Sequence, residues 1–538
     1  MKIALSQINT ATGDLTFNTQ KMVQTIAQAQ NEGIDLLVFP ELSLPGYPPK
    51  DFIFTSDWFT QQEKKIQEVR AASAGIHVIL GVIHKHENKI YNAAMWMDRD
   101  GKTTLQKKRL LPNQDVFDEK RYFAPGDTQS VWQIDQERIG ISVCEDLWAP
   151  FFPQYTVDPI AELAQQKPTV MINISASPFV AGKDKVRKDL VQNHQKSYSC
   201  PFLYLNLVGG NDELIFDGGS FAMAADGRLL MQIKSFEEDV LIFDTDREAL
   251  DIAAYPEDIL EQKKHAIVLG LQDFVHKSGF KKVVLGLSGG IDSAVVAGLA
   301  VEALGAENVI TVFMPTQYTR DISEIDAKSI ARNLGTRWYE LPMDEVKNQL
   351  QANIATMLER TMQSLTFENM QARIRGVILM AVSSEENALV LQTGNKSEMA
   401  LGYCTLYGDM VGAISPIADL YKHEVYGIGK LLNQDTEVIP ARVFQRAPSA
   451  ELKADQEDTD SLPPYDVVDP IVRMCVEEGK SVEEAAAAGY DLAIVQKLYG
   501  WIENQEFKRK QAPPVLKVSS KAFGVGRRMA IAKRGYAD

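Results

Sequence analysis

A glycine-rich stretch near the middle of the chain has the residue types of a phosphate-binding loop. Residues 288–293 read Ser-Gly-Gly-Ile-Asp-Ser and follow the apolar run 283–287. Glycines let the backbone approach a phosphate closely, and N–H groups at the start of the following helix can hold an anion. Asp292 cannot help to bind a bare phosphate, so it predicts Mg²⁺ beside a triphosphate. The simpler interpretation is a tight turn in which Ser or Asp caps a helix.

Three residues of the first half have the types needed to hydrolyse an amide. Cys144 follows the apolar run 139–143, Glu41 follows the run 37–39, and Lys108 lies in a basic stretch. Amide hydrolysis by cysteine needs a thiolate, a base that takes its proton, and a cation for the developing oxyanion. Each residue also has a plain structural explanation, as a small buried hydrophobe, a cap or a solvated lysine. Strand ends and loops are, however, where such groups converge in clefts.

The elements that must position these residues follow from the apolar periodicity. In the first half, buried strands are predicted over KIALSQI, DLLVFPE, HVILGVI, IGISVCEDLW, TVMINISASP, LYLNLVG and LIFDT. The run FNTQKMVQTIAQAQNEG has helical spacing and predicts a helix with Gly33 as its C-cap. Many strands and few helices favour sheets covered by helices.

After about residue 251 the pattern changes to alternating helices and strands. Helices are predicted over 258–279, 292–305, 323–335 and 370–387, and strands over 281–287, 308–315 and 388–394. This alternation predicts a parallel, doubly wound sheet. We therefore expect two domains, residues 1–250 and 251–538. The acidic, proline-bearing stretch 451–466 is predicted to be a long loop.

Composition limits the possible functions. The 538 residues include 45% apolar and 24% charged residues, as in ordinary globular proteins. No apolar run reaches the roughly 20 residues that span a bilayer, and the N-terminal residues do not form a signal peptide. The net charge of −16 disfavours a nonspecific nucleic-acid or membrane binder. The four cysteines form no C-x-x-C pair, so neither a zinc site nor a disulfide framework is indicated, and a reducing cytoplasm is predicted.

The central loop, in its strand-to-helix setting, resembles the pyrophosphate loop of the ATP pyrophosphatases, which adenylate a substrate oxygen. Motifs that resemble those of NAD synthetases follow in order at 367–375 (FENMQARIR), 393–398 (TGNKSE), 407–409 (YGD), 448–452 (PSAEL) and 522–528 (AFGVGRR). The resemblance implies an ATP site formed by Gly286, Leu287, Ser288, Gly289, Gly290, Ile291, Asp292, Ser293 and Thr393. It implies Mg²⁺ at Asp292 and Glu398, and deamido-NAD⁺ contacts from Asn369, Glu398 and Lys517. For Arg373, a substrate contact and a simple ion pair stay equally open.

The first half resembles the nitrilase superfamily over about residues 1–245. The trio Glu41, Lys108 and Cys144 occurs in order, with further similar motifs at 41–47, 117–123 and 175–179. The resemblance implies Glu41 as general base, Lys108 as oxyanion stabiliser, Cys144 as nucleophile and Glu119 as a supporting carboxylate. Tyr47, Gln114, Ser177 and Lys183 match glutamine-pocket positions. A tyrosine commonly follows Leu-Pro-Asn in this family, so the glutamine at 114 leaves a side-chain role there open.

The fused order resembles the glutamine-dependent NAD synthetases. It implies an α/β protein, with an N-terminal α-β-β-α sandwich and a C-terminal Rossmann-like ATP pyrophosphatase domain. The expected reaction amidates deamido-NAD⁺ to NAD⁺ through an adenylated intermediate, with glutamine or ammonia as nitrogen donor. AMP, pyrophosphate and glutamate are released. ATP is the co-substrate and Mg²⁺ the cofactor; the resemblance also implies a homo-oligomer and an internal ammonia tunnel, and we expect neither a nucleic acid nor a membrane as partner.

Two other functions stay open at this point. One is another glutamine-dependent ATP pyrophosphatase, such as a GMP synthetase, although the motifs at 369–375 and 393–398 argue against it. The other is an amidase whose second half binds nucleotide only as a regulator. A pure interaction protein would leave both reactive constellations unexplained.

Overall fold

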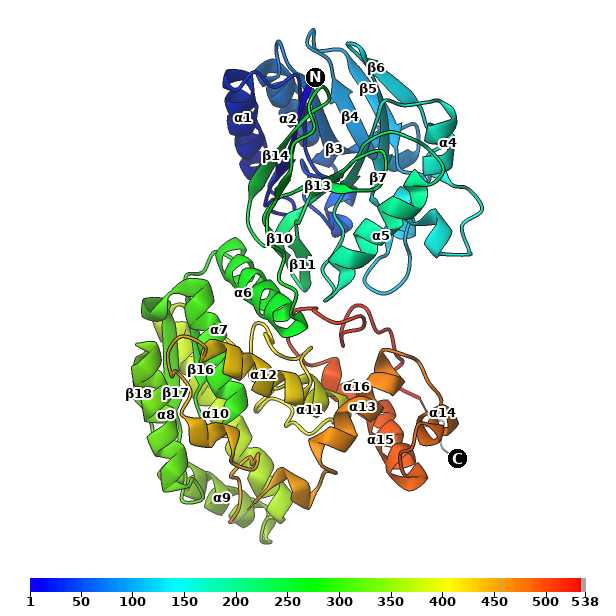
Figure 1. Cartoon of the computed structure of the whole chain (residues 1–538). Helices are drawn as coiled ribbons and strands as arrows, with labels where there is room; N and C mark the ends of the chain where they lie inside the picture. The colour runs from blue at the N-terminus through cyan, green and yellow to red at the C-terminus, as the bar shows by residue number, and fades with distance from the viewer. Residues whose placement is uncertain (455, 534–538) are drawn as a thin grey trace. The chain divides into compact units, whose positions relative to one another are not determined.

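The computed structural model describes residues 1–454 and 456–533. The chain divides into two compact units, Met1–Glu257 and the residues from Asp258 onward (Figure 1). Within the described ranges, none of the helices has the length and apolarity needed to cross a membrane.

The first unit contains two large sheets. The first has the order β14-β1-β2-β3-β4-β5 and the second the order β15-β13-β12-β9-β8-β7-β6. The strands of the first sheet are β1 (Lys2–Gln7), β2 (Leu36–Val38), β3 (His77–His86), β4 (Lys89–Met97), β5 (Thr103–Lys107) and β14 (Asp239–Asp244). Those of the second are β6 (Val131–Ile134), β7 (Glu137–Val143), β8 (Val170–Ser175), β9 (Phe202–Asn206), β12 (Phe221–Met223), β13 (Leu229–Gln232) and β15 (Asp251–Ile252). A hairpin pairs β10 (Val208–Asn211) with β11 (Leu214–Asp217).

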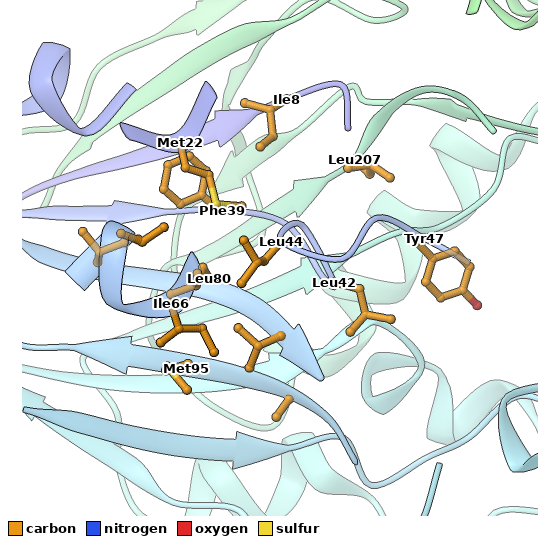
Figure 2. Packing of buried hydrophobic residues seen from close by; sticks show 14 of the residues in the cluster. Ile8, Met22, Phe39, Leu42, Leu44, Tyr47, Ile66, Leu80, Met95 and Leu207 are labelled. Atoms are coloured by element: carbon orange, nitrogen blue, oxygen red, sulfur yellow. The ribbon is translucent and has the colours of Figure 1, made fainter. Parts of the chain in front are cut away.

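Helices cover the outer faces of both sheets. The helices of this unit are α1 (Leu15–Asn31), α2 (Trp58–Ala72), α3 (Glu119–Tyr122), α4 (Pro159–Gln165) and α5 (Lys183–Gln195), with the 3₁₀ helices η1 (Lys50–Phe54) and η2 (Cys144–Phe151). Alternation along β3 shows the layering, because Leu80 packs in one cluster with Met22 of α1 and Ile66 of α2 (Figure 2). Its neighbour Ile79 packs in the cluster between the sheets, with Ile141 of β7.

The second sheet repeats this arrangement on its own outer face. Leu203 of β9 packs between the sheets, while Tyr204 packs in a cluster with Ile160 of α4 and Leu190 of α5. The predicted α-β-β-α sandwich is therefore confirmed.

The predicted helix of the first half is present, with its end one residue earlier than expected. Asp14 caps α1 by accepting a hydrogen bond of 2.9 Å from the backbone N–H of Phe17. Glu32 is the C-cap, and Gly33 follows it with a φ of +65°, the left-handed conformation that glycine adopts most easily.

The second unit contains a parallel sheet in the order β18-β17-β16-β19. Its strands are β16 (Lys282–Gly286), β17 (Val309–Phe313), β18 (Arg337–Glu340) and β19 (Ala388–Val390). Its helices are α6 (Ile259–Lys277), α7 (Ile291–Leu304), α8 (Asp321–Leu334), α9 (Asp344–Leu358), α10 (Ser364–Glu386), α11 (Lys396–Leu401), α12 (Lys422–Leu432), α13 (Tyr465–Val476), α14 (Val482–Ala487), α15 (Leu492–Asn504) and α16 (Glu506–Arg509), with the 3₁₀ turns η3 (Ala306–Asn308), η4 (Ala441–Phe444) and η5 (Asp458–Asp460).

Helices lie on both faces of this sheet. Val284 of β16 packs with Met370 and Ile374 of α10. Its buried neighbours Val283 and Leu285 point to the other face, where α7 lies against β16 and β17. The predicted doubly wound parallel sheet is confirmed.

The predicted long loop over 451–466 is irregular in its described part. Only the short turn η5 interrupts it before α13 begins at Tyr465. Residue 455 lies outside the described residues. The loop is held by Leu452, whose N–H donates to the side chain of Gln456 at 2.8 Å, and by Tyr465, whose hydroxyl donates to Asp458 at 2.9 Å.

Candidate active sites

In the first unit, a lysine ammonium lies between two carboxylates in a fully buried position. Lys108, directly after β5, donates to Oε1 of Glu41 at 2.7 Å and to Oε1 of Glu119 at 2.8 Å. Glu41 lies just beyond β2, and Glu119 is the first residue of α3. Burial opposes the charge of Lys108, but the two carboxylates raise the pKa of its ammonium well above the usual range. The site therefore contains a fixed positive charge.

Glu41 is held by further donors. The side-chain amide of Asn92 donates to Oε1 of Glu41 at 2.7 Å, and the backbone N–H of Ala176 donates to Oε2 at 2.7 Å. Asn92 lies in β4, and its backbone carbonyl also accepts from the N–H of Lys108 at 2.8 Å. Asn92 was not predicted as a site residue. A lone polar residue inside the apolar strand KIYNAAMWM is the only sequence signal for it.

Cys144 lies where β7 turns sharply into η2. Its φ of +44° is unusual for a residue with a side chain, and it is the first residue of η2. Burial, together with the charge of Glu41, raises the pKa of the Cys144 thiol well above its usual range, while Lys108 lowers it. The thiol therefore needs a base beside it before it can attack, and Glu41 is such a group.

The predicted glutamine-pocket residues have different settings. The hydroxyl of buried Tyr47 donates to Glu119 at 2.9 Å, so Tyr47 contacts the charged cluster directly. The carbonyl of buried Ser177 accepts from Arg187 at 2.9 Å, and Lys183 donates to the carbonyl of Pro178 at 3.0 Å. Gln114 is exposed, and its side-chain oxygen accepts from the adjacent N–H of Asn113 at 3.3 Å.

In the second unit, the glycine loop joins β16 to α7. Gly289 has a φ of +79°, and a Cβ there would lie 2.3 Å from the carbonyl oxygen of Ser323, so only glycine fits. The hydroxyl of Ser293 accepts from the N–H of Ser288 at 3.2 Å and lies 3.1 Å from the Ser288 hydroxyl. The N–H of Gly290 points to the Ser288 hydroxyl at 3.3 Å. The loop is thus preformed by its own hydrogen bonds.

Asp292 and Glu398 converge on one ammonium. Lys422, the first residue of α12, lies 2.5 Å from Oδ2 of Asp292 and 3.6 Å from Oε1 of Glu398. Asn395 binds both carboxylates: its side chain donates to Asp292 at 2.9 Å, and its N–H donates to Glu398 at 3.1 Å. Burial and the charge of Asp292 raise the pKa of the Glu398 carboxyl, while Lys422 lowers it. Lys422 was not predicted; it is 130 residues from Asp292 in the sequence.

Asp292, Glu398 and Lys422 line one cavity of about 290 Å³. Its walls include every predicted ATP residue except Gly289, together with Glu398. Its walls also include Arg375 and Glu451, which belong to the motifs at 367–375 and 448–452. Polar wall residues outside those motifs include Gln392, Lys422, Arg446 and Asp458. The cavity combines a glycine loop, a helix N-terminus and cations, which suits an anionic nucleotide.

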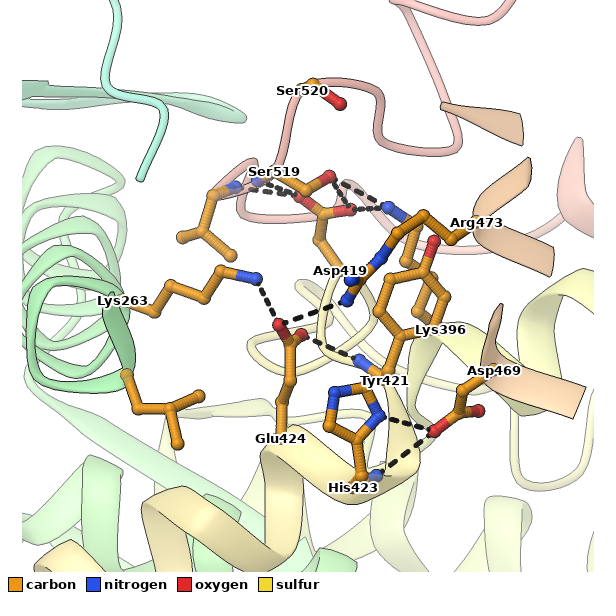
Figure 3. A network of polar contacts seen from close by, with 12 residues as sticks. Lys263, Lys396, Asp419, Tyr421, His423, Glu424, Asp469, Arg473, Ser519 and Ser520 are labelled. Carbon is orange, nitrogen blue, oxygen red and sulfur yellow. Dashed lines mark hydrogen bonds and ion pairs between the residues drawn. The ribbon is translucent and has the colours of Figure 1, made fainter. Parts of the chain in front are cut away.

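The helix that carries Glu398 is anchored on its other face by a buried polar network (Figure 3). Lys396 lies 2.9 Å from Asp419 and donates to Glu477 and to the Ser519 hydroxyl at 2.8 Å each. Asp419 in turn accepts from the N–H and hydroxyl of Ser519 at 2.7 Å each. This network fixes the position of Glu398, which lies two residues after Lys396 in α11.

Comparison with known proteins identifies the chain. Residues 2–255 match the carbon-nitrogen hydrolase family, and residues 264–512 match the NAD synthase family. A glutamine-dependent NAD(+) synthetase of Synechocystis sp. is 41% identical over 99% of this chain and 98% of that protein. The chain belongs to the glutamine-dependent NAD(+) synthetase family. The resemblance and the enzyme class expected from the sequence are thereby confirmed.

Two further members of the glutamine-dependent NAD(+) synthetase family agree with this. The protein of Thermotoga maritima is 39% identical over 99% of both chains. The structure of the Acinetobacter baumannii enzyme in complex with ADP is 35% identical, covers 98% of both chains and has a TM-score of 0.79. None of these matches favours a GMP synthetase or a regulated amidase.

Besides Gly289, three predicted residues of the second unit are absent from the wall of this cavity, as far as the described residues show. Asn369 accepts a hydrogen bond of 2.9 Å from the Thr405 hydroxyl. Lys517 is buried and donates to the carbonyl of Ser519 at 2.8 Å. Arg373 is exposed on α10 and donates to the carbonyl of Leu406 at 3.1 Å, and it lines a second cavity, with residues of α9, instead of this one.

Proposed function

We propose that the first unit hydrolyses the side-chain amide of glutamine at Cys144. The observation that carries this proposal is the buried ion pair between Lys108 and Glu41 beside a buried thiol. Glu41 takes the proton of Cys144 as the sulfur attacks the amide carbon. The ammonium of Lys108 stabilises the oxyanion that forms. Ammonia leaves, and water then cleaves the thioester to release glutamate.

The supporting residues hold this arrangement in place. Glu119 also binds the ammonium of Lys108 and itself accepts a hydrogen bond from the Tyr47 hydroxyl. We assign Ser177 and Lys183 to the wall of the glutamine pocket, because Lys183 binds the carbonyl next to Ser177. For Gln114 we propose backbone contact only, since its side-chain oxygen is engaged by Asn113.

In the second unit, we propose that ATP adenylates the nicotinate carboxylate of deamido-NAD⁺. A carboxylate is a poor electrophile, and the mixed anhydride with AMP makes its carbon open to attack by ammonia. The backbone N–H groups of the loop 288–293 would bind the phosphates, and Lys422 would offset their charge as pyrophosphate leaves. Ammonia then displaces AMP and gives NAD⁺. Asn369, Glu398 and Lys517 stay proposed contacts of deamido-NAD⁺.

The residues present fit a magnesium ion. Asp292 and Glu398 already converge on a single cation, the Lys422 ammonium. Mg²⁺ binds through one or two carboxylates plus substrate phosphates, so Asp292 and Glu398 would be enough to hold it. When bound, Mg²⁺ would neutralise the phosphate charge that develops on the leaving pyrophosphate.

Two features of the setting complete the proposal. Cys144, Cys200, Cys404 and Cys475 are free, which supports a reducing cytoplasm.

We also propose a homo-oligomer. Apolar side chains are exposed on α9 and α10, among them Val346, Met357, Leu365 and Val377, and exposed apolar patches of this kind mark protein contacts. Sedimentation velocity tests the oligomeric state.

The decisive experiment measures NAD⁺ formation from deamido-NAD⁺, ATP and Mg²⁺ with glutamine and, separately, with ammonium. Cys144→Ala should abolish glutamine use and leave ammonium use within about twofold, because the nucleophile is lost and the second site is intact. Cys200→Ala, which removes another buried thiol of the same unit, should keep both activities. Equal loss of both activities in Cys144→Ala would contradict the separation of the two sites.

A further inference from the structure

Asp146 connects the turn that carries Cys144 to the segment that follows Lys108. Its carboxylate is fully buried. Oδ1 accepts from the backbone N–H groups of Arg109 at 3.0 Å and Leu110 at 2.9 Å. Oδ2 accepts from the N–H of Val143 at 3.2 Å and from the side-chain amide of Gln129 at 3.3 Å.

The bond to Val143 alone would be an ordinary cap of η2, because it stays within the same turn. The two bonds of Oδ1 have a different character, since their donors are 36 and 37 residues away in the sequence. Their donors are the two residues that follow Lys108, whereas the donor of the cap is the residue before Cys144. One carboxylate therefore links the chain on either side of the nucleophile and of the oxyanion-stabilising cation.

The hydrogen bonds of Asp146 are needed because Cys144 and Lys108 are each held by other contacts and not by one another. Lys108 is bound to Glu41 and Glu119, and Cys144 has a strained left-handed backbone. A strained turn persists only where its surroundings hold it. A misplacement of about 1 Å between reacting groups can reduce a rate about a hundredfold.

We propose that Asp146 is a positioning residue that sets the spacing between the Cys144 thiolate and the Lys108 ammonium during glutamine hydrolysis. This inference rests on the proposed roles of Cys144 and Lys108. In this role Asp146 acts through the backbone of residues 143, 109 and 110. The four bonds to its carboxylate described above all come from N–H groups, so an amide of the same shape would place an NH₂ group against at least one of them.

The test uses the full-length enzyme and Asp146→Asn. Iodoacetamide alkylation of Cys144 counts the intact sites, and the glutamine-dependent kcat is expressed per such site. This kcat should fall about a hundredfold, while the KM for glutamine changes less than about threefold. Ammonium-dependent synthesis should stay at the wild-type rate. Asp158→Asn is the matched control: Asp158 also accepts two backbone N–H bonds, at 3.1 Å each, at the start of α4. It should keep the wild-type kcat.

The fraction of enzyme molecules whose Cys144 reacts with iodoacetamide distinguishes a positioning role of Asp146 from a role in folding. A purely structural role would reduce the number of reactive sites and leave kcat per site unchanged, and that result would overturn the proposal. If Asp146→Asn fails to fold, Gln129→Met serves instead, because it removes one donor to Asp146 and keeps the carboxylate. A reduced kcat per site with unchanged KM supports the proposal, and a wild-type value overturns it.

Cys144→Ala is measured in parallel. If it retains glutamine-dependent synthesis, the proposed function itself fails. If it loses that activity while Asp146→Asn behaves as wild type, only the role of Asp146 fails.

Discussion

The ammonium of Lys422 lies 2.5 Å from the carboxylate of Asp292, across 130 residues of sequence. Both residues line the cavity that we propose as the nucleotide site, and Lys422 is almost fully buried. Although burial lowers it, the carboxylates of Asp292 and Glu398 raise the pKa of Lys422 above its usual range. The cavity thus has a permanent cation where the glycine loop meets α11.

Lys422→Met should lower kcat/KM for ATP about 10²–10³-fold with either nitrogen donor, because one cation that offsets the phosphate charge is lost. Steady-state NAD⁺ formation with ammonium measures this without involving the first unit. Lys430→Met removes an exposed lysine of the same helix and should have no effect. An unchanged kcat/KM in Lys422→Met would remove Lys422 from the nucleotide site.

The two adjacent glycines of the loop should respond differently to alanine. A Cβ at Gly289 would meet the Ser323 carbonyl oxygen at 2.3 Å in a left-handed backbone, whereas a Cβ at Gly290 has its nearest neighbour, the Ser288 hydroxyl, at 3.4 Å. Gly289→Ala should therefore lower the free energy of unfolding by about 1–3 kcal/mol and reduce ammonium-dependent synthesis more than a hundredfold. Gly290→Ala should fold normally. Thermal unfolding and steady-state rates test both; similar stability of the two variants would contradict the strain argument.

The reactivity of Cys144 should depend on pH beyond the range of an ordinary thiol. Because burial and the charge of Glu41 raise its pKa, the Cys144 thiol stays protonated where a free cysteine of pKa about 8.5 is already half ionised. Its alkylation by uncharged iodoacetamide should thus keep increasing above about pH 9. Mass spectrometry of the labelled peptide follows this rate. Glu41→Gln removes a negative charge and should move the profile to lower pH; a plateau by about pH 9 in the wild-type enzyme would contradict the prediction.

Much of the fold could be predicted because its signals are local. The run KKVVLGL and the helix after Asp292 have the apolar periodicity of a buried strand and helix, and both are present as β16 and α7. By contrast, β18 reads Arg-Trp-Tyr-Glu at the edge of the sheet and is at most half-buried, so it has no apolar pattern to detect. Its place in the sheet comes from pairing with β17, which is a tertiary contact.

The candidate sites also could be predicted only where their residues belong to local motifs. Cys144, Glu41 and Lys108 could be singled out because each belongs to a recognisable motif, and the structure brings Glu41 and Lys108 together at 2.7 Å. Asn92 and Lys422 lie in no such motif. Their contacts arise only when distant strands and helices meet, so a single sequence gives no signal for their partners.

The buried network of Lys396, Asp419 and Ser519 has a consequence for the order in which the second unit folds during translation. Lys396 and Ser519 are separated by 123 residues, so translation at about 5–20 residues per second delivers Ser519 roughly 6–25 s after Lys396. Until then, Asp419 has no N–H donors from residues 518 and 519, and the helix that presents Glu398 lacks one side of its support. A nascent chain that already contains every residue of the glycine loop therefore still lacks the contacts that hold the helix carrying Glu398.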